Sequence, residues 1–127
     1  MTDKKSLVII PTYNELENTK KLIPDILQRY ENIDVLIVDD NSPDGTGTYV
    51  NNLSKSNPRV KLIQREKKLG LGTAYIAGFK YAIEHKYDFI FEMDADYSHD
   101  PGEIKNFLKA IEAVSYTHLT LPTNREV

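Results

Sequence analysis

The chain has 127 residues, 40% hydrophobic and 28% charged, which is typical of one globular domain and excludes disordered and collagen-like proteins. The formal net charge of −3 argues against a surface that binds nucleic acid or anionic lipid by bulk electrostatics, so we expect no nucleic-acid partner. The lack of cysteine excludes disulfides and thiolate metal sites, and it suits a reducing compartment.

Short apolar runs alternate with helical patterns from the N-terminus onward. Apolar runs predict strands over residues 7–10, 35–38, 60–63 and 87–93. Helical spacing of apolar residues predicts helices over residues 16–30, around residues 49–53 and over residues 71–83, and Pro24 should kink or restart the first of them. Asp100, Pro101 and Glu103 are typical of an N-cap, N1 and N3, so a further helix should follow. This alternation predicts an α/β fold with a mostly parallel sheet between two layers of helices.

The last stretch, residues 115–127, shows neither helical nor strand periodicity. It resembles translated adaptor sequence, so we interpret it as a non-native or disordered tail after a truncated reading frame. We therefore expect a single domain over residues 1–114. The apolar run that ends at Pro11 is too short for a signal peptide or a membrane span, which indicates a protein that faces the cytoplasm.

Two carboxylates two residues apart follow the last apolar run. Asp94 and Asp96 stand where a buried strand should reach solvent, and side chains at i and i+2 of an extended segment point the same way. One Mg²⁺ or Mn²⁺ could meet both acids, because hard cations prefer carboxylate oxygens and leave other positions to water or phosphate. The competing interpretation is a solvated Asp-x-Asp turn.

Three loops, at residues 11–15, 39–46 and 94–96, each follow an apolar run. If the runs are parallel strands, all three loops emerge at one edge of the sheet, where ligands of α/β proteins gather. An aromatic ring, several carboxylates and open backbone would suit a nucleoside diphosphate with its metal. A plain Asx-rich turn is the alternative for residues 39–46, and a calcium loop is disfavoured because Asn51 stands where a bidentate Glu is needed.

Cations precede a Gly-x-Gly at residues 70–72. Arg65, Lys67 and Lys68 would lie beside the start of a helix, which makes either a phosphate-facing corner or a solvated charge cluster. A dinucleotide fingerprint is disfavoured because Tyr75 stands where Gly or Ala should pack. His99 is either a further metal ligand or a loop histidine bonded to backbone.

Four ordered motifs carry a resemblance to a known family. They are LVIIPTYNE at residues 7–15, VDDNSPDGT at 38–46, KLGLGTAY at 68–75 and MDADYSHDP at 93–101. Together they resemble the family-2 glycosyltransferases, and within them the dolichol-phosphate (polyprenol-phosphate) mannose synthases, over about residues 5 to 114. The resemblance implies a GT-A fold, which is a Rossmann-like three-layer α/β/α sandwich, here truncated at the C-terminus. It also implies GDP-mannose as the donor and Mg²⁺ or Mn²⁺ held through the DxD motif.

The resemblance further implies site residues by position. Asp94 and Asp96 would be catalytic and would bind the metal. The nucleotide-sugar site would comprise Pro11, Tyr13, Glu15, Ile37, Asp39, Asp40, Lys68, Asp94, Ala95 and Asp96. Ser98 stands where some relatives have a Gln near the metal. The family's later Gly-Ser-Arg loop and membrane anchor have no counterpart here, which puts activity of this chain by itself in doubt.

The reaction that the resemblance implies is an inverting displacement. Dolichyl or polyprenyl phosphate would attack the anomeric carbon of the sugar while GDP departs, at the cytoplasmic face of a membrane that the full-length protein contacts peripherally. Because the acceptor phosphate is already anionic, no dedicated general base is expected. Two alternatives remain open: a family-2 polyprenyl-phosphate glucosyltransferase that uses UDP-glucose, and a nucleotide-binding module without turnover.

Overall fold

The computed structural model describes residues 5–67, 69–96 and 101. Strands and helices alternate throughout this part, which confirms the predicted order of elements. They are β1 (Ser6–Thr12), α1 (Leu16–Arg29), β2 (Ile33–Asp39), α2 (Thr46–Ser56), β3 (Val60–Gln64), α3 (Leu71–Glu84) and β4 (Phe89–Glu92). The helix predicted after Asp100 and the tail at residues 115–127 lie outside the described residues.

Two predicted details differ from the structure. β4 is shorter than residues 87–93, because the Tyr87 amide donates to the Ala82 carbonyl (3.0 Å) and so belongs to the turn that ends α3. α1 does not restart at Pro24 but stays helical from Leu16 to Arg29. Burial of Leu22, Ile23 and Ile26 on the sheet holds both halves of this helix in place, which offsets the one backbone hydrogen bond that proline removes.

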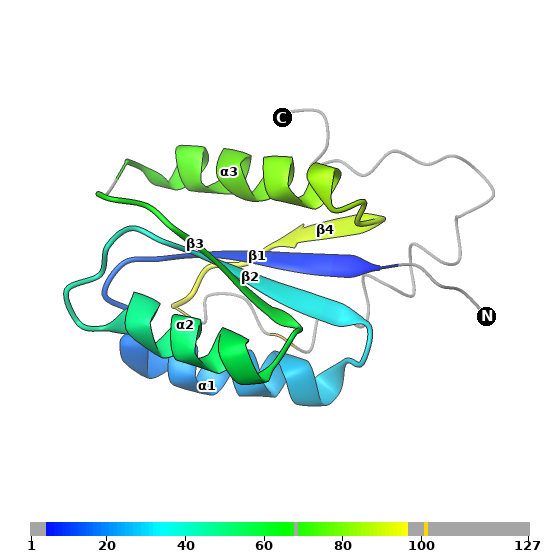
Figure 1. The fold of residues 1–127 in the computed structure, drawn as a ribbon, viewed down its shortest axis with the longest axis horizontal. Coiled ribbons are helices and arrows are strands. Elements are labelled where there is room, and N and C mark those ends of the chain that lie inside the picture. The colour runs from blue at the N-terminus through cyan, green and yellow to red at the C-terminus, as the bar shows by residue number, and fades with distance from the viewer. Residues whose placement is uncertain (1–4, 68, 97–100, 102–127) are drawn as a thin grey trace.

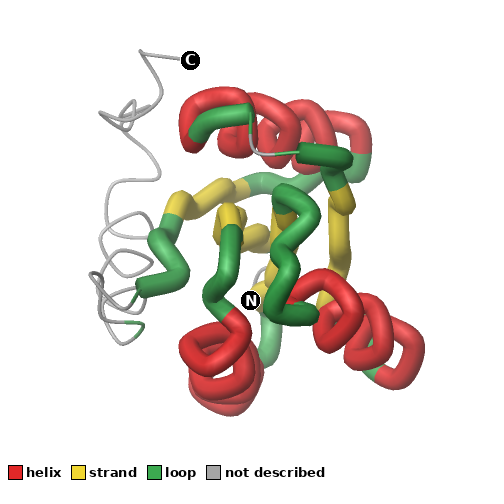
Figure 2. The backbone as a smooth tube through the Cα atoms, turned by 90° about the vertical axis from the view of Figure 1, so that its left-hand side faces the viewer, coloured by secondary structure: helices red, strands yellow, loops and turns green. Residues whose placement is uncertain are grey.

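The strands form one parallel sheet in the order β3-β2-β1-β4. Helices α1 and α2 cover one face, and α3 covers the other (Figure 1). Figure 2 shows the same three layers from the side, with the strands between the two sets of helices. This arrangement confirms the predicted three-layer α/β/α architecture. None of the helices in the described part of the chain is long and apolar enough to cross a membrane.

Each face of the sheet has its own apolar core. Val8, Ile10 and Ile37 belong to the cluster under α1 and α2, whereas Ile9 and Val38 belong to the cluster under α3. Covering both faces explains why the strands are continuous apolar runs rather than alternating ones. α3 lies unusually close to β1 at Gly78, where an added Cβ would be 2.6 Å from Ile9 Cγ2.

The strand order creates a crevice at the carboxyl edge of the sheet. β1 lies between β2 and β4, and the chain leaves β1 into α1 on one face but enters β4 from α3 on the other. Ligands of α/β proteins bind outside the carboxyl ends of the strands, near the point where the strand order reverses, which here is at β1. The loops after β1 and β4 are those that carry Tyr13 and Asp94.

Candidate active site

A cavity of about 290 Å³ lies at this carboxyl edge. Four segments line it: the end of β1 with its loop, the residue after β2, the start of α3 and the loop after β4. The lining residues are Pro11, Thr12, Tyr13, Glu15, Asp40, Gly70, Ala74, Asp94, Ala95 and Asp96. The structure therefore brings together seven of the residues proposed from sequence for the nucleotide-sugar site: Pro11, Tyr13, Glu15, Asp40, Asp94, Ala95 and Asp96.

The loop that carries Tyr13 is locked against the loop after β2. Asn14 adopts a left-handed conformation (φ 57°), and its amide donates to Ser42 Oγ at 2.9 Å. In return, the Asp44 amide donates to Asn14 Oδ1 at 3.3 Å. These contacts hold the β1–α1 loop in the shape that leaves the Tyr13 side chain exposed at the cavity.

Asp44 joins the first turns of two helices. Its Oδ2 accepts the Leu16 amide of α1 at 3.0 Å, and its Oδ1 accepts both the amide (3.0 Å) and the hydroxyl (2.5 Å) of Thr46 in α2. Some loss of solvation raises the pKa of Asp44, but the hydrogen bonds from Thr46 and Leu16 together outweigh it, so the pKa lies below its usual value. The carboxylate is therefore ionised and serves as a shared cap.

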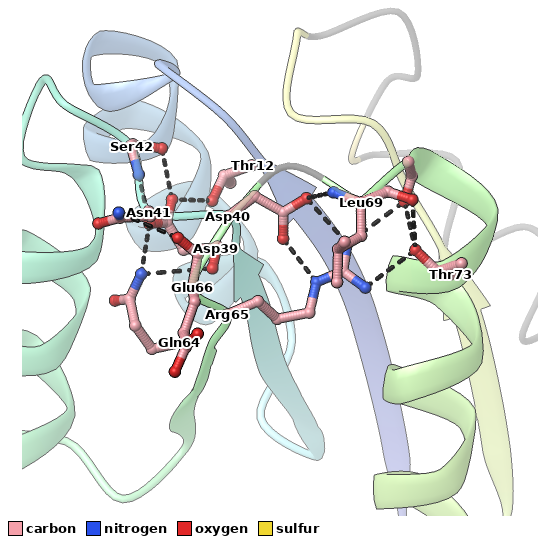
Figure 3. Close-up of polar contacts among 11 residues, drawn as sticks. Thr12, Asp39, Asp40, Asn41, Ser42, Gln64, Arg65, Glu66, Leu69 and Thr73 are labelled. Carbon is pink, nitrogen blue, oxygen red and sulfur yellow. Dashed lines mark hydrogen bonds and ion pairs between the residues drawn. The ribbon is translucent and has the colours of Figure 1, made fainter.

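Asp39 supports the cavity wall from behind (Figure 3). Its side chain is fully buried and accepts four hydrogen bonds. Oδ1 accepts the hydroxyls of Thr12 and Ser42, both at 2.6 Å. Oδ2 accepts the Ser42 amide at 3.0 Å and Gln64 Nε2 at 2.9 Å. Thr12 and Gln64 are its register partners on β1 and β3, so the carboxylate ties three strands together.

The next residue, Asp40, faces the cavity and forms an ion pair with Arg65. The Arg65 guanidinium donates from Nε to Asp40 Oδ1 at 2.6 Å and from Nη2 to Oδ2 at 2.8 Å. The sequence left open whether Arg65 faces a phosphate or belongs to a solvated charge cluster, and the structure pairs it with a carboxylate instead. The hydrogen bond to Asp40 raises the pKa of Arg65, burial lowers it, and the charge of Asp40 raises it further, with a net rise.

The acidic loop after β4 has a partner that sequence reasoning missed. Tyr75 of α3 donates its hydroxyl to Asp94 Oδ1 at 2.9 Å. Burial raises the pKa of Tyr75 strongly, and the hydrogen bond to Asp94 and the charges of Glu92 and Asp96 raise it further, so this hydroxyl remains a donor. Burial, and then the charge of Asp94, also raise the pKa of Glu92. The sequence signal that could have identified Tyr75 as a site residue was its place in the motif KLGLGTAY. The helical pattern instead assigned Tyr75 to the apolar face that packs on the sheet.

The oxygen donors of Asp94 and Asp96 fit a hard divalent cation. Both residues line the cavity, Asp94 half-buried and Asp96 exposed. No group of three or more His, Cys, Asp or Glu side chains suited to a metal occurs within residues 5–67, 69–96 and 101. A pair of acids fits Mg²⁺ or Mn²⁺, which commonly take a few carboxylates and fill their other positions with water or substrate phosphate. His99 and Ser98 lie outside the described residues.

Two of the proposed site residues do not line the cavity. Ile37 is fully buried in the core under α1 and α2, because its side chain points into that face of the sheet. Asp39 is fully buried as well, and its oxygens accept the four hydrogen bonds described above. Neither side chain is among those that line the cavity. Lys68 lies outside the described residues.

Sequence relatives match most of this chain. It is 43% identical over 111 residues to the polyprenol monophosphomannose synthase of Mycolicibacterium smegmatis, covering 87% of this chain and 42% of the relative. It is 45% identical over 105 residues to the undecaprenyl-phosphate mannosyltransferase of Micrococcus luteus, covering 83% and 43%. It is 43% identical over 110 residues to the dolichol-phosphate mannosyltransferase of Pyrococcus furiosus, covering 85% and 30%. The chain thus spans less than half the length of these curated relatives.

Solved structures share the fold. A mannosyltransferase from Pyrobaculum calidifontis, PcManGT, in complex with GDP-Man and Mn²⁺, superposes with a TM-score of 0.65 at 22% identity, over 87% of this chain and 33% of that one. S. aureus TarS superposes with a TM-score of 0.67 at 24% identity, over 87% and 20%. The sequence also matches the family described as Glycosyl transferase family 2 over residues 7–121. The chain therefore belongs to glycosyl transferase family 2, and its sheet and helices are those of a GT-A glycosyltransferase.

Proposed function

We propose that this chain forms the nucleotide-sugar-binding part of a polyprenyl-phosphate mannosyltransferase. The whole protein would transfer mannose from GDP-mannose to dolichyl or polyprenyl phosphate with inversion at the anomeric carbon. The observation that carries the proposal is the single cavity that joins Tyr13, Glu15 and Asp40 to Asp94 and Asp96. The curated relatives, all named as synthases or transferases of mannosyl polyprenyl phosphates, support the same substrate class.

The nucleoside half of the cavity has the chemistry that a guanine nucleotide needs. Tyr13 offers an exposed aromatic ring beside which a base can stack. Glu15 and Asp40 offer carboxylate oxygens, which accept hydrogen bonds only, for the base N–H groups and the ribose hydroxyls. The Asp44 cap and the Asn14–Ser42 contact hold these groups in place, so little ordering is left for the moment of binding.

The diphosphate half is acidic. Asp94 and Asp96 would hold Mg²⁺ or Mn²⁺, which, when bound, supplies the positive charge that offsets the leaving diphosphate. Tyr75 fixes the orientation of the Asp94 carboxylate through its hydroxyl. Ala95, between the two acids, is 4% exposed and anchors the loop in the core under α1 and α2.

The acceptor supplies its own nucleophile. A phosphate oxygen of the lipid attacks the anomeric carbon and forms a new C–O bond, while the bond from that carbon to the diphosphate breaks and GDP leaves with the electron pair. Attack from the face opposite the leaving group inverts the carbon. A phosphate monoester is ionised at neutral pH, so the step needs no proton acceptor. We place this reaction at the cytoplasmic face of a membrane, with the lipid held by the full-length protein.

Calorimetry with GDP, with and without Mn²⁺, tests the site. We expect Mn²⁺-dependent binding in the unaltered chain, and Asp96→Ala should weaken it by at least about 100-fold, or about 3 kcal/mol, because one of the two carboxylate ligands of the cation is lost. Unchanged Mn²⁺-dependent binding in Asp96→Ala would refute the metal assignment. Arg29→Gln, which breaks an exposed ion pair with Asp25 on α1, is the matched control.

A transfer assay separates the remaining alternatives. Radiolabelled GDP-mannose is incubated with a short polyprenyl phosphate and Mn²⁺, and the lipid phase is counted. Transfer supports the mannosyltransferase, and binding without transfer by this chain supports a nucleotide-binding module. In a separate competition experiment, labelled GDP is displaced by unlabelled UDP or unlabelled GDP. Displacement at a lower concentration of UDP than of GDP would favour the UDP-glucose enzyme.

A further inference from the structure

We propose that Arg65 is a positioning residue of the cavity, which joins the Asp40 carboxylate to the first turn of α3 so that both form one rigid wall. The inference rests on the proposed function, because the wall is the one against which we place the nucleoside. Arg65 itself does not line the cavity, whereas Asp40 and Gly70, which it connects, do.

The guanidinium contacts both sides of the wall (Figure 3). On one side, Nε and Nη2 hold the two oxygens of Asp40, and both side chains are mostly buried, 12% and 8% exposed. On the other side, Nη1 donates to Thr73 Oγ1 at 3.0 Å and Nη2 donates to the Gly70 carbonyl at 3.3 Å. The Leu69 amide, just before α3, adds a long contact by donating to Asp40 Oδ2 at 3.4 Å. One side chain thus spans the loop after β2 and the start of α3.

Only arginine has the geometry for this connection. A planar guanidinium presents five N–H groups in a fixed fork, so it can bind a carboxylate with two parallel hydrogen bonds and still donate sideways. A lysine ammonium at the same place would keep the charge but lose the fork. The Arg65 backbone adds to the precision, because its amide donates to the Asp39 carbonyl at 2.8 Å and fixes the start of the side chain against β2.

The connection leaves Asp40 able to accept a ligand. An ionised carboxylate offers about four acceptor positions. The contacts described above use three of them: Nε on Oδ1, and Nη2 and the Leu69 amide on Oδ2. Within residues 5–67, 69–96 and 101, no contact takes the second position on Oδ1, which can accept from an N–H or O–H donor in the cavity. Arg65 also offsets the charge of Asp40 in a wall that a nucleotide diphosphate must approach.

Ligand-free hydrogen exchange tests the positioning directly, in the full chain. The Ala74 amide, which donates to the Gly70 carbonyl at 3.2 Å, reports on the first turn of α3. We expect Arg65→Gln to speed its exchange at least about tenfold, Arg65→Lys to speed it less, and Arg29→Gln to leave it unchanged. Unaltered exchange at Ala74 in Arg65→Gln would overturn the proposal, whether or not the protein binds nucleotide.

Binding and stability then separate positioning from simple structural support. We expect Arg65→Lys to weaken Mn²⁺-dependent GDP binding at least about tenfold. The double variant Asp40→Asn/Arg65→Gln should regain unfolding stability relative to Arg65→Gln, since no uncompensated buried charge remains, but it should not regain GDP binding. Recovery of binding along with stability, or GDP affinity within twofold in Arg65→Lys, would overturn the proposal. No GDP binding in the unaltered chain would instead refute the proposed function and leave the exchange result to decide the role of Arg65.

Discussion

Replacing Asp39 with alanine should destabilise the fold far more than replacing it with asparagine. Alanine removes the acceptor of four hydrogen bonds in a fully buried place. The hydroxyls of Thr12 and Ser42 can rotate toward other acceptors and the exposed Gln64 side chain can turn to water, but the Ser42 amide cannot easily do so. Four hydrogen bonds lost at about 0.5–1.5 kcal/mol each predict a loss of about 2–6 kcal/mol in the free energy of unfolding.

Asparagine fits because the two carboxylate oxygens have different kinds of partner. An amide oxygen in the place of Oδ2 still accepts the two N–H donors from Ser42 and Gln64. An NH₂ in the place of Oδ1 meets two hydroxyl oxygens, those of Thr12 and Ser42, and a hydroxyl can reverse to accept. We therefore expect Asp39→Asn to cost only about 1 kcal/mol, for the loss of charge-assisted hydrogen bonds.

Urea unfolding of the three proteins, followed by circular dichroism and tyrosine fluorescence, measures both changes. The slopes of the unfolding curves should agree, so that the midpoints report stability alone. Equal destabilisation by asparagine and alanine would refute the reasoning, because the argument depends on which partner can reverse its hydrogen bond. A cost below about 1 kcal/mol for alanine would refute the claim that the four donors depend on Asp39.

Four other substitutions test neighbouring features. Gly47→Ala should lower the free energy of unfolding by about 1–3 kcal/mol, because its Cβ would lie 2.9 Å from Asp39 Oδ2, which hydrogen bonds hold in place, as well as 2.2 Å from Gln64 Oε1. Gly72→Ala, with nothing within 4 Å, should be neutral or stabilising by urea unfolding. Asp44→Ala should cost about 2 kcal/mol through two lost helix caps. Because the pKa of Asp44 is lowered, its contribution is complete above the unfolded value of 3.8 and is lost as pH falls through the folded value, so the stability gap between the unaltered protein and Asp44→Ala should shrink below about pH 4 in pH-dependent unfolding. Tyr75→Phe should weaken Mn²⁺-dependent GDP binding about three- to tenfold in calorimetry with stability nearly unchanged, since only the donor to Asp94 is lost.

The sequence predicted the elements well because parallel strands covered on both faces are continuous apolar runs. The runs at β1 and β2 each end in a polar turn, so their ends and the shared edge of their loops follow from the pattern alone. The sequence could not predict which of two adjacent acids faces the cavity. That choice depends on β2 lying between β1 and β3, which places Thr12 and Gln64 on either side of Asp39 and leaves Asp40 for the cavity.

The sequence did not predict the partners of Arg65 and Tyr75 either. Each contact joins side chains brought together only by the fold: Arg65 lies 25 positions from Asp40, and Tyr75 lies 19 from Asp94. Local patterns therefore left Arg65 as either a phosphate-facing or a solvated cation, and they assigned Tyr75 to the packing face of its helix. Their actual roles follow from the strand order and from α3 crossing behind β1 and β4.

The shared cap at Asp44 also limits how far the entrance to the cavity can open. Swinging the β1–α1 loop away from the loop after β2 would separate Leu16 from Asp44 and break the Asn14–Ser42 contact at the same time. If this costs about 2 kcal/mol, the swung-out form occupies only about 3% of molecules at room temperature. A ligand then meets the closed arrangement in nearly every encounter. The few per cent of molecules in the swung-out form, which cannot bind it, lower the apparent affinity by only the same few per cent.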